Sequence, residues 1–166
     1  ASTREKHLLY GEITREGVNE IFKRLGCYIN HDTVLYDLGS GFGTFIFHVS
    51  IEKNVKKAIG VEKHRPRFAW AFNNVPRYKY LSSVPPMFEL GDYFNRMTYH
   101  DASFVYWDNT MFLDSPEESQ KLMKMLPSGC VVVLRATSCL LNYDWTEFIC
   151  PTSYNRQSKA KWTIIP

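Results

Sequence analysis

The sequence predicts a doubly wound α/β fold, with a mostly parallel sheet and an antiparallel hairpin at one edge. Short apolar runs alternate along the chain with segments whose apolar residues recur at helical spacing. Such alternation is typical of a parallel sheet with helices on both faces. An acid and three glycines at alternate positions follow the first apolar run, where a buried strand would turn into a helix. The last apolar runs have no helix between them, which favours the hairpin.

Each element is predicted from its local pattern. Residues 14–25 have apolar side chains at helical spacing and stop at Gly26. Ser115 and Pro116 suit the cap and first position of a helix that ends near residue 126. The other helices are predicted over residues 43–53 and 64–73, a loop over 76–86, and the strands over 33–38, 57–61, 87–90, 103–107, 130–134, 148–149 and 162–165.

Composition fits an ordinary globular protein: 45% of the 166 residues are hydrophobic and 22% are charged. The length predicts a single domain over residues 1–166, with a polar lead-in over residues 1–9. The cysteines form no C-x-x-C pair and no zinc spacing, so we expect no metal site and a reducing, intracellular compartment. No apolar run is long enough to span a membrane.

The net charge of +3 is too small to indicate a nucleic-acid-binding protein by itself. Basic residues do cluster at two places, where a solvated surface is the simpler interpretation and nucleic-acid contact the alternative. The clusters are Lys53, Lys56 and Lys57, and Lys63, Arg65 and Arg67.

The glycine segment predicts a site for a cofactor that carries adenosine. Gly39, Gly41 and Gly43 follow Asp37, and glycine lets a ligand approach the backbone closely. Thr44 stands where the third glycine of the dinucleotide pattern G-x-G-x-x-G would be, which disfavours a nicotinamide enzyme. An acid before G-x-G-x-G resembles motif I of S-adenosylmethionine-dependent methyltransferases.

Polar side chains fall at the ends of four consecutive predicted strands, which is where doubly wound sheets bind ligands. Glu62 is placed to accept hydrogen bonds from both hydroxyls of a ribose. Asp92 is placed to bind the amino group of adenine, with Tyr93 or Phe94 against the ring. Asp37 would anchor the glycine turn or the cofactor's amino group, and Asp108 and Asn109 mark the fourth strand end.

A set of short motifs in fixed order is more specific than the turn alone. The motifs are Tyr10-Gly11-Glu12, Tyr36-Asp37-Leu38-Gly39-Ser40-Gly41-Phe42-Gly43, Gly60-Val61-Glu62-Lys63, Gly91-Asp92-Tyr93 and Asp108-Asn109-Thr110-Met111-Phe112. Over residues 10–142 the chain resembles the disruptor-of-telomeric-silencing family, the histone lysine methyltransferases that lack a SET domain. The resemblance implies a seven-stranded sheet of the class I methyltransferase type.

The resemblance also implies roles for individual residues. Tyr10 and Glu12 would fold over the methionine end of S-adenosylmethionine, with Thr14 beside them. Asn109 would orient the acceptor amine through its side-chain carbonyl, between aromatic walls. Asp108 and Thr110 depart from the family's asparagine and aromatic residue, and Tyr154 or Trp162 would supply an aromatic from the chain end. The cofactor-binding prediction is Tyr10, Glu12, Thr14, Asp37, Gly39, Ser40, Gly41, Gly43, Glu62, Asp92, Tyr93 and Asn109, and the catalytic prediction is Tyr10, Asn109, Phe112 and Trp162.

The resulting hypothesis is a protein lysine N-methyltransferase that uses S-adenosylmethionine and acts on a histone or nucleosome, which would place it in the nucleus. A methyltransferase of the same fold with a non-histone protein, an RNA or a small molecule as substrate is the enzymatic alternative. No proline follows Asn109, which disfavours a nucleobase amine as the acceptor. A binding module without catalytic activity is the third alternative, and it would not need the glycine turn and Glu62.

Overall fold

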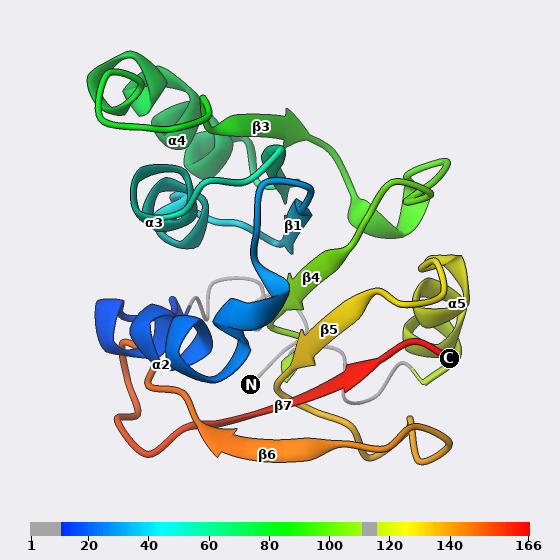
Figure 1. Cartoon of the computed structure of the whole chain (residues 1–166). Helices are drawn as coiled ribbons and strands as arrows, with labels where there is room; N and C mark the ends of the chain where they lie inside the picture. Colours follow the sequence, from blue (N-terminus) through cyan, green and yellow to red (C-terminus); the bar gives the residue numbers. More distant parts are fainter. Residues whose placement is uncertain (1–10, 111–115) are drawn as a thin grey trace.

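The structure is a computed structural model that describes residues 11–110 and 116–166. It consists of helices and strands that alternate through most of the chain (Figure 1). The helices are α2 (Arg15–Leu25), α3 (Thr44–Glu52), α4 (Arg65–Tyr78) and α5 (Pro116–Met125), with short 3-10 helices η1 (Gly26–Tyr28) and η2 (Tyr93–Asn95). The strands are β1 (Val34–Leu38), β2 (Lys57–Glu62), β3 (Met87–Leu90), β4 (Phe104–Trp107), β5 (Val131–Leu134), β6 (Thr146–Ile149) and β7 (Lys159–Ile164).

The strands form one seven-stranded sheet in the order β3-β2-β1-β4-β5-β7-β6. The first five of these are parallel, and in register Leu38 lies opposite both Val61 and Trp107. Strand β7 is antiparallel to β5 and to β6, which forms the sheet edge. The predicted doubly wound sheet with an antiparallel hairpin at one edge is therefore confirmed, and the carboxyl ends of β1 to β5 lie along one edge.

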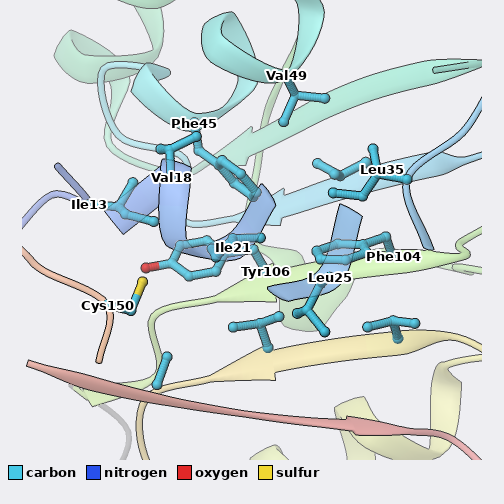
Figure 2. Packing of buried hydrophobic residues seen from close by; sticks show 14 of the residues in the cluster. Ile13, Val18, Ile21, Leu25, Leu35, Phe45, Val49, Phe104, Tyr106 and Cys150 are labelled. Carbon is cyan, nitrogen blue, oxygen red and sulfur yellow. The ribbon is translucent and has the colours of Figure 1, made fainter. Parts of the chain in front are cut away.

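Two hydrophobic layers hold the sheet between helices, because the central strands are buried on both faces. Helices α2, α3 and α4 lie on one side in Figure 1, and α5 lies on the other. Leu35, Phe104 and Val133 face the α2–α3 layer, while their chain neighbours Tyr36, Val105 and Val132 face the α5 layer. Figure 2 shows the first layer, where Leu35 and Phe104 lie beside helix α2 and Phe45 comes from helix α3.

The longest difference from the sequence prediction is in α4, which continues to Tyr78 instead of ending near residue 73. Pro76 lies within this helix on an exposed side and removes one backbone donor. The amide of Lys79 still donates to the carbonyl of Val75, so the last turn closes in spite of the proline. The other boundaries differ by at most three residues, the largest of these at the start of β7, and the two 3-10 helices were not predicted. None of the helices in the described part of the chain has both the length and the apolar character of a membrane span.

Candidate cofactor and acceptor site

The glycine turn joins β1 to α3, and its three glycines all adopt left-handed backbone conformations. The φ angles are +78° at Gly39, +57° at Gly41 and +86° at Gly43. Residues with a Cβ are strained in this region by roughly 1–2 kcal/mol each. Backbone hydrogen bonds fix the turn, since the amides of Gly39 and Ser40 both donate to the carbonyl of Val61. The alternate spacing in the sequence thus has a direct conformational cause.

Glu62, the last residue of β2, holds the turn from the neighbouring strand. Its Oε2 accepts from the amide of Gly41 at 2.8 Å, and its Oε1 accepts from the amide of His64 at 2.7 Å. The guanidinium of Arg67 lies 3.5 Å from Oε1, and the Glu62 side chain is almost fully buried. A carboxylate has about four lone-pair positions, so Glu62 keeps acceptor capacity for a ligand while it fixes the backbone that would contact that ligand.

Asp37 is a buried carboxylate without a hydrogen-bond donor among the described residues, with only 4% of its surface exposed. Burial raises its pKa well above the usual 3.8, and the nearby carboxylates of Glu12, Glu62 and Asp108 raise it further. This clustering of carboxylates favours a positively charged ligand. Asp37 lines a narrow cavity of about 20 Å³ together with Gly11, Glu12, Ile13, Gly39, Ser40, Phe45, Tyr106 and Asp108.

Residues 11–13 meet the loop between β6 and β7 at this cavity. Ile13 forms an isolated β-bridge with Thr152, and the carbonyl of Glu12 accepts from the amide of Ser153 at 2.8 Å. The Glu12 carboxylate accepts a short hydrogen bond from the hydroxyl of Thr44, the first residue of α3. A Cβ at Gly11 would lie 2.1 Å from the ring of Tyr154, so the absence of a side chain lets this tyrosine cover the segment.

Asn109 has a structural contact pattern that the sequence did not indicate. Its Oδ1 accepts from the amides of Arg135 at 3.1 Å and Ala136 at 2.8 Å, and its Nδ2 donates to the carbonyl of Ala136 at 2.6 Å. Both lone pairs of the carbonyl are therefore occupied. The side chain is buried and ties the ends of β4 and β5 together, so the expected contact between this oxygen and an acceptor amine needs correction.

Asp108 takes the position toward the cavity that was expected for Asn109. Its Oδ1 accepts from the amide and the hydroxyl of Thr110, at 3.3 and 2.7 Å, and the residue lines the same cavity as Asp37. The position of Asp108 directly after a strand indicates a site residue, but the family pattern favours the asparagine that follows it. Tyr106 and Phe45 also line the cavity and were missed, because as apolar strand and helix residues they could not be told from the core.

Two other predicted site residues have structural partners instead. Thr14 caps α2: its hydroxyl accepts from the amide of Gly17 and donates to the carbonyl of Pro151. Tyr93 is buried, and its hydroxyl accepts from the indole of Trp107 at 2.9 Å. A Cβ at Gly39 would lie 3.6 Å from the Tyr93 ring, so this tyrosine supports the glycine turn and is not an open platform for an adenine ring.

Trp162 is not brought to this site. It lies within β7 opposite Val133, and its ring centroid is 5.9 Å from that of Tyr28, the last residue of η1. Of the two chain-end aromatics considered, Tyr154 is the one beside the cavity. Asp92 caps η2 through a hydrogen bond from the amide of Phe94 and remains partly exposed. The predicted residues Tyr10 and Phe112 lie outside the described residues.

The two basic clusters lie at opposite ends of β2. Lys56 and Lys57 are at its start, and Lys63 follows its end at the carboxyl edge. In the first cluster Lys53 lies over the ring of Phe22 at 4.6 Å, and Lys57 is 3.9 Å from Asp101. The two basic clusters, although close in the sequence, therefore do not form one basic patch.

Comparisons with known proteins identify a family for this chain. Residues 4–114 match the family described as "Histone methylation protein DOT1". The chain belongs to this family. The turn at Gly39–Gly43, Asp37 and Glu62 all lie within the matched part. A search of curated protein sequences finds no match to the chain.

Solved structures similar to this DOT1-family chain are class I methyltransferase folds. An RNA methyltransferase from Salinibacter ruber in complex with S-adenosyl-L-homocysteine has a TM-score of 0.67 at 19% identity, over 92% of both chains. Magnesium protoporphyrin IX methyltransferase from Synechocystis PCC 6803 with bound SAM has a TM-score of 0.68 at 12% identity, over 90% of this chain and 78% of that one. Precorrin 8w decarboxylase from Methanobacterium thermoautotrophicum has a TM-score of 0.68 at 14% identity, over 96% and 95%. At these identities the likeness establishes the fold.

Replacing Asp37 with asparagine is expected to stabilise the DOT1-family chain at neutral pH. Because its pKa is raised in the folded state, the folded protein binds more protons than the unfolded chain, and the free energy of unfolding falls as pH rises above 3.8. The Asp37→Asn variant lacks this loss, so we expect a gain on the order of 1 kcal/mol at neutral pH and none in acid. Urea unfolding across this pH range measures it, and an unchanged pH dependence would contradict it.

Replacing Asn109 with alanine is expected to destabilise the protein by about 3 kcal/mol, because two amides and one carbonyl lose their buried partner. Urea unfolding of Asn109→Ala tests this. Asn73, which is exposed on α4, provides the control: Asn73→Ala should change stability by less than about 0.5 kcal/mol. Equal effects of the two substitutions would show that the Asn109 contacts contribute nothing specific.

Proposed function

We propose that the protein is an S-adenosylmethionine-dependent protein lysine N-methyltransferase that acts on a histone or nucleosome and works in the nucleus. The observation that carries the proposal is the buried carboxylate of Asp37, which has no hydrogen-bond donor among the described residues, beside a left-handed glycine turn in a chain of the DOT1 family. S-adenosylmethionine fits this site chemically, since its sulfonium and its amino group are both cationic. When bound, it supplies a methyl group activated by the positive sulfur.

The residues that would hold the cofactor divide by chemistry. Glu62 and Asp92 suit the hydroxyls and the amino group of adenosine, and the glycine turn leaves room beside the backbone. Asp37 and Glu12 suit the positive charge, because carboxylates in a poorly solvated site stabilise a nearby cation strongly. Each of these assignments follows from position and charge at the carboxyl edge of the sheet.

Asp108, and not Asn109, is the residue that we propose contacts the acceptor amine. It lines the cavity with one carboxylate oxygen engaged by Thr110, whereas the Asn109 carbonyl has no free lone pair. A lysine side chain arrives as an ammonium, which a carboxylate attracts, and it must lose a proton before it attacks a methyl group. The amine releases that proton to the solvent, and its orientation by Asp108 supplies most of the rate.

Methyl transfer to reconstituted nucleosomes and to free histones, followed by mass spectrometry of the product, tests the proposal. We expect methylated lysine, and we expect Asp108→Ala to reduce transfer by about 10²-fold while it leaves cofactor binding within a few-fold of wild type. Asp144→Ala, at an exposed position, is the matched control. Cofactor binding with transfer only to RNA or small molecules would contradict the lysine assignment, and absence of cofactor binding would contradict the enzyme.

A further inference from the structure

Helix α4 is largely exposed. Ala71 is its only buried residue, and the helix lies beside the edge strand β3 at the periphery of the molecule (Figure 1). Large aromatic side chains are nevertheless concentrated there: Trp70 is 48% exposed, Phe72 is 55% exposed and Tyr80, just after the helix, is 85% exposed. Exposed aromatic side chains on this helix and on the turn after it mark a candidate interaction site.

The charged residues of the same segment are all basic. Residues 63–88 contain five lysines and arginines and no aspartate or glutamate. Arg67 is paired with Glu62, but the described residues provide no ion pair for the other four, which are all exposed. These four are Lys63, Arg65, Arg77 and Lys79. A partner that matches this surface must carry negative charge.

Cations and rings are placed together along the segment. The Arg77 guanidinium lies 5.7 Å from the Tyr78 ring centroid, and the Lys79 ammonium lies 5.2 Å from that of Tyr80. An open groove of about 640 Å³ adjoins the helix, and Trp70 meets Phe42 edge to face at its wall, with ring centroids 5.6 Å apart. A ligand on this surface would contact apolar rings and cationic groups at the same time.

We infer that α4 and the turn after it, residues 63–81, form a binding surface for single-stranded nucleic acid. Phosphates suit the unpaired cations, and unstacked bases suit exposed rings, since stacking on aromatic side chains is how such proteins hold a strand. A duplex keeps its base faces covered, and an acidic peptide supplies charge without flat rings. A second copy of this chain would bring like charges together on this face.

The surface directly follows Glu62 along the chain, and Phe42 of the glycine turn contacts it. It is distinct from the cluster at Lys53–Lys57, which lies at the other end of β2. The inference does not depend on methyl transfer, because the test reads strand binding without a cofactor. Failure of either proposal therefore leaves the other standing.

Fluorescence anisotropy with labelled oligouridine and oligothymidine of about 16 nucleotides tests the inference. We expect log affinity to fall with log salt at a slope of about −3, the value for four phosphate contacts on a single strand. Trp70→Leu and Phe72→Leu should each weaken binding by about tenfold with an unchanged slope, because leucine keeps apolar area but does not stack. Trp70→Phe should retain most of the affinity.

The contribution of charge is tested with Arg65→Gln combined with Lys79→Gln. This double variant should make the slope of log affinity against log salt shallower by about 1.4. Lys121→Gln combined with Lys124→Gln on α5 is the matched control and should leave the slope unchanged. Urea unfolding confirms that each variant is folded. The inference is overturned if neither oligonucleotide binds at low salt, or if the leucine variants bind as tightly as wild type. It is also overturned if duplex DNA or polyglutamate binds as tightly as the single strands. A dimer in sedimentation experiments that is lost on substitution of Trp70 would overturn it as well.

Discussion

Replacing Glu62 with glutamine is expected to lower S-adenosylmethionine affinity by about a hundredfold, or about 2.7 kcal/mol. The carboxylate accepts from two backbone amides, those of Gly41 and His64, and charge-assisted hydrogen bonds contribute roughly 1.5–3 kcal/mol each. An amide side chain can accept at only one oxygen and would point a donor at the other amide. The glycine turn would then lose its fixed position relative to β2. Isothermal titration calorimetry measures the effect.

The matched control is Glu89 on the neighbouring strand β3, whose carboxylate is also paired with an arginine, at 3.0 Å from Arg96. Glu89→Gln should leave cofactor affinity within about twofold, because this pair lies away from the glycine turn. Equal losses in both variants would show that general destabilisation explains the result. An unchanged affinity in Glu62→Gln would contradict the role of Glu62 and favour a module that does not use the cofactor.

Replacing Gly43 with alanine is expected to destabilise the fold by about 3 kcal/mol. Part of this comes from the left-handed backbone, at φ +86°, which penalises any Cβ by about 1 kcal/mol or more. The rest comes from packing, because a Cβ at this position would lie 2.6 Å from the ring of Phe88. That contact is well inside van der Waals distance, so α3 or β3 would have to shift. Urea or thermal unfolding measures the loss.

Gly129 separates the two contributions. It has nearly the same φ, +84°, but a Cβ there would meet nothing within 4 Å. Gly129→Ala should therefore lose only the conformational part, about 1 kcal/mol. The difference in stability loss between the two variants measures the clash with Phe88. A difference near zero would mean that β3 moves aside without a measurable cost.

The glycine turn shows what sequence can predict well. Left-handed conformation is a property of the single residue, so glycines at positions 39, 41 and 43 could be read as a turn before any contact was known. Strand ends are nearly as local, since an apolar run ends where burial ends. Both turned out as expected, and they placed Asp37 and Glu62 at one edge of a parallel sheet.

The acceptor side was predicted less well, because it depends on partners far away in the chain. Asn109 was expected to face a substrate, but its carboxamide binds the backbone at residues 135 and 136. Nothing local distinguishes a carboxamide that binds a ligand from one that binds a returning loop. The same reason explains Thr14, whose hydroxyl contacts Pro151 across 137 residues of chain.

The aromatic at the chain end is the clearest case. Both Tyr154 and Trp162 matched the family's aromatic in the sequence and Trp162 was the predicted catalytic residue, but the path of β7 separates them. Tyr154 lies in the loop before β7 and reaches Gly11, whereas Trp162 lies within the strand and packs near Tyr28. Which ring reaches a site is a question of long-range placement.

The sequence by itself determined the alternating fold, the glycine turn and the carboxylates at the strand ends. Backbone conformation and the spacing of buried residues depend on residues that are neighbours in the sequence. The tertiary structure decided which of those polar groups remain available. It used the hydrogen-bonding capacity of Thr14 and of the Asn109 carbonyl for structure, and within residues 11–110 and 116–166 it left Asp37 without a donor beside Asp108. Free and occupied polar groups differ only in contacts made by distant segments, and those contacts exist only once the chain has folded.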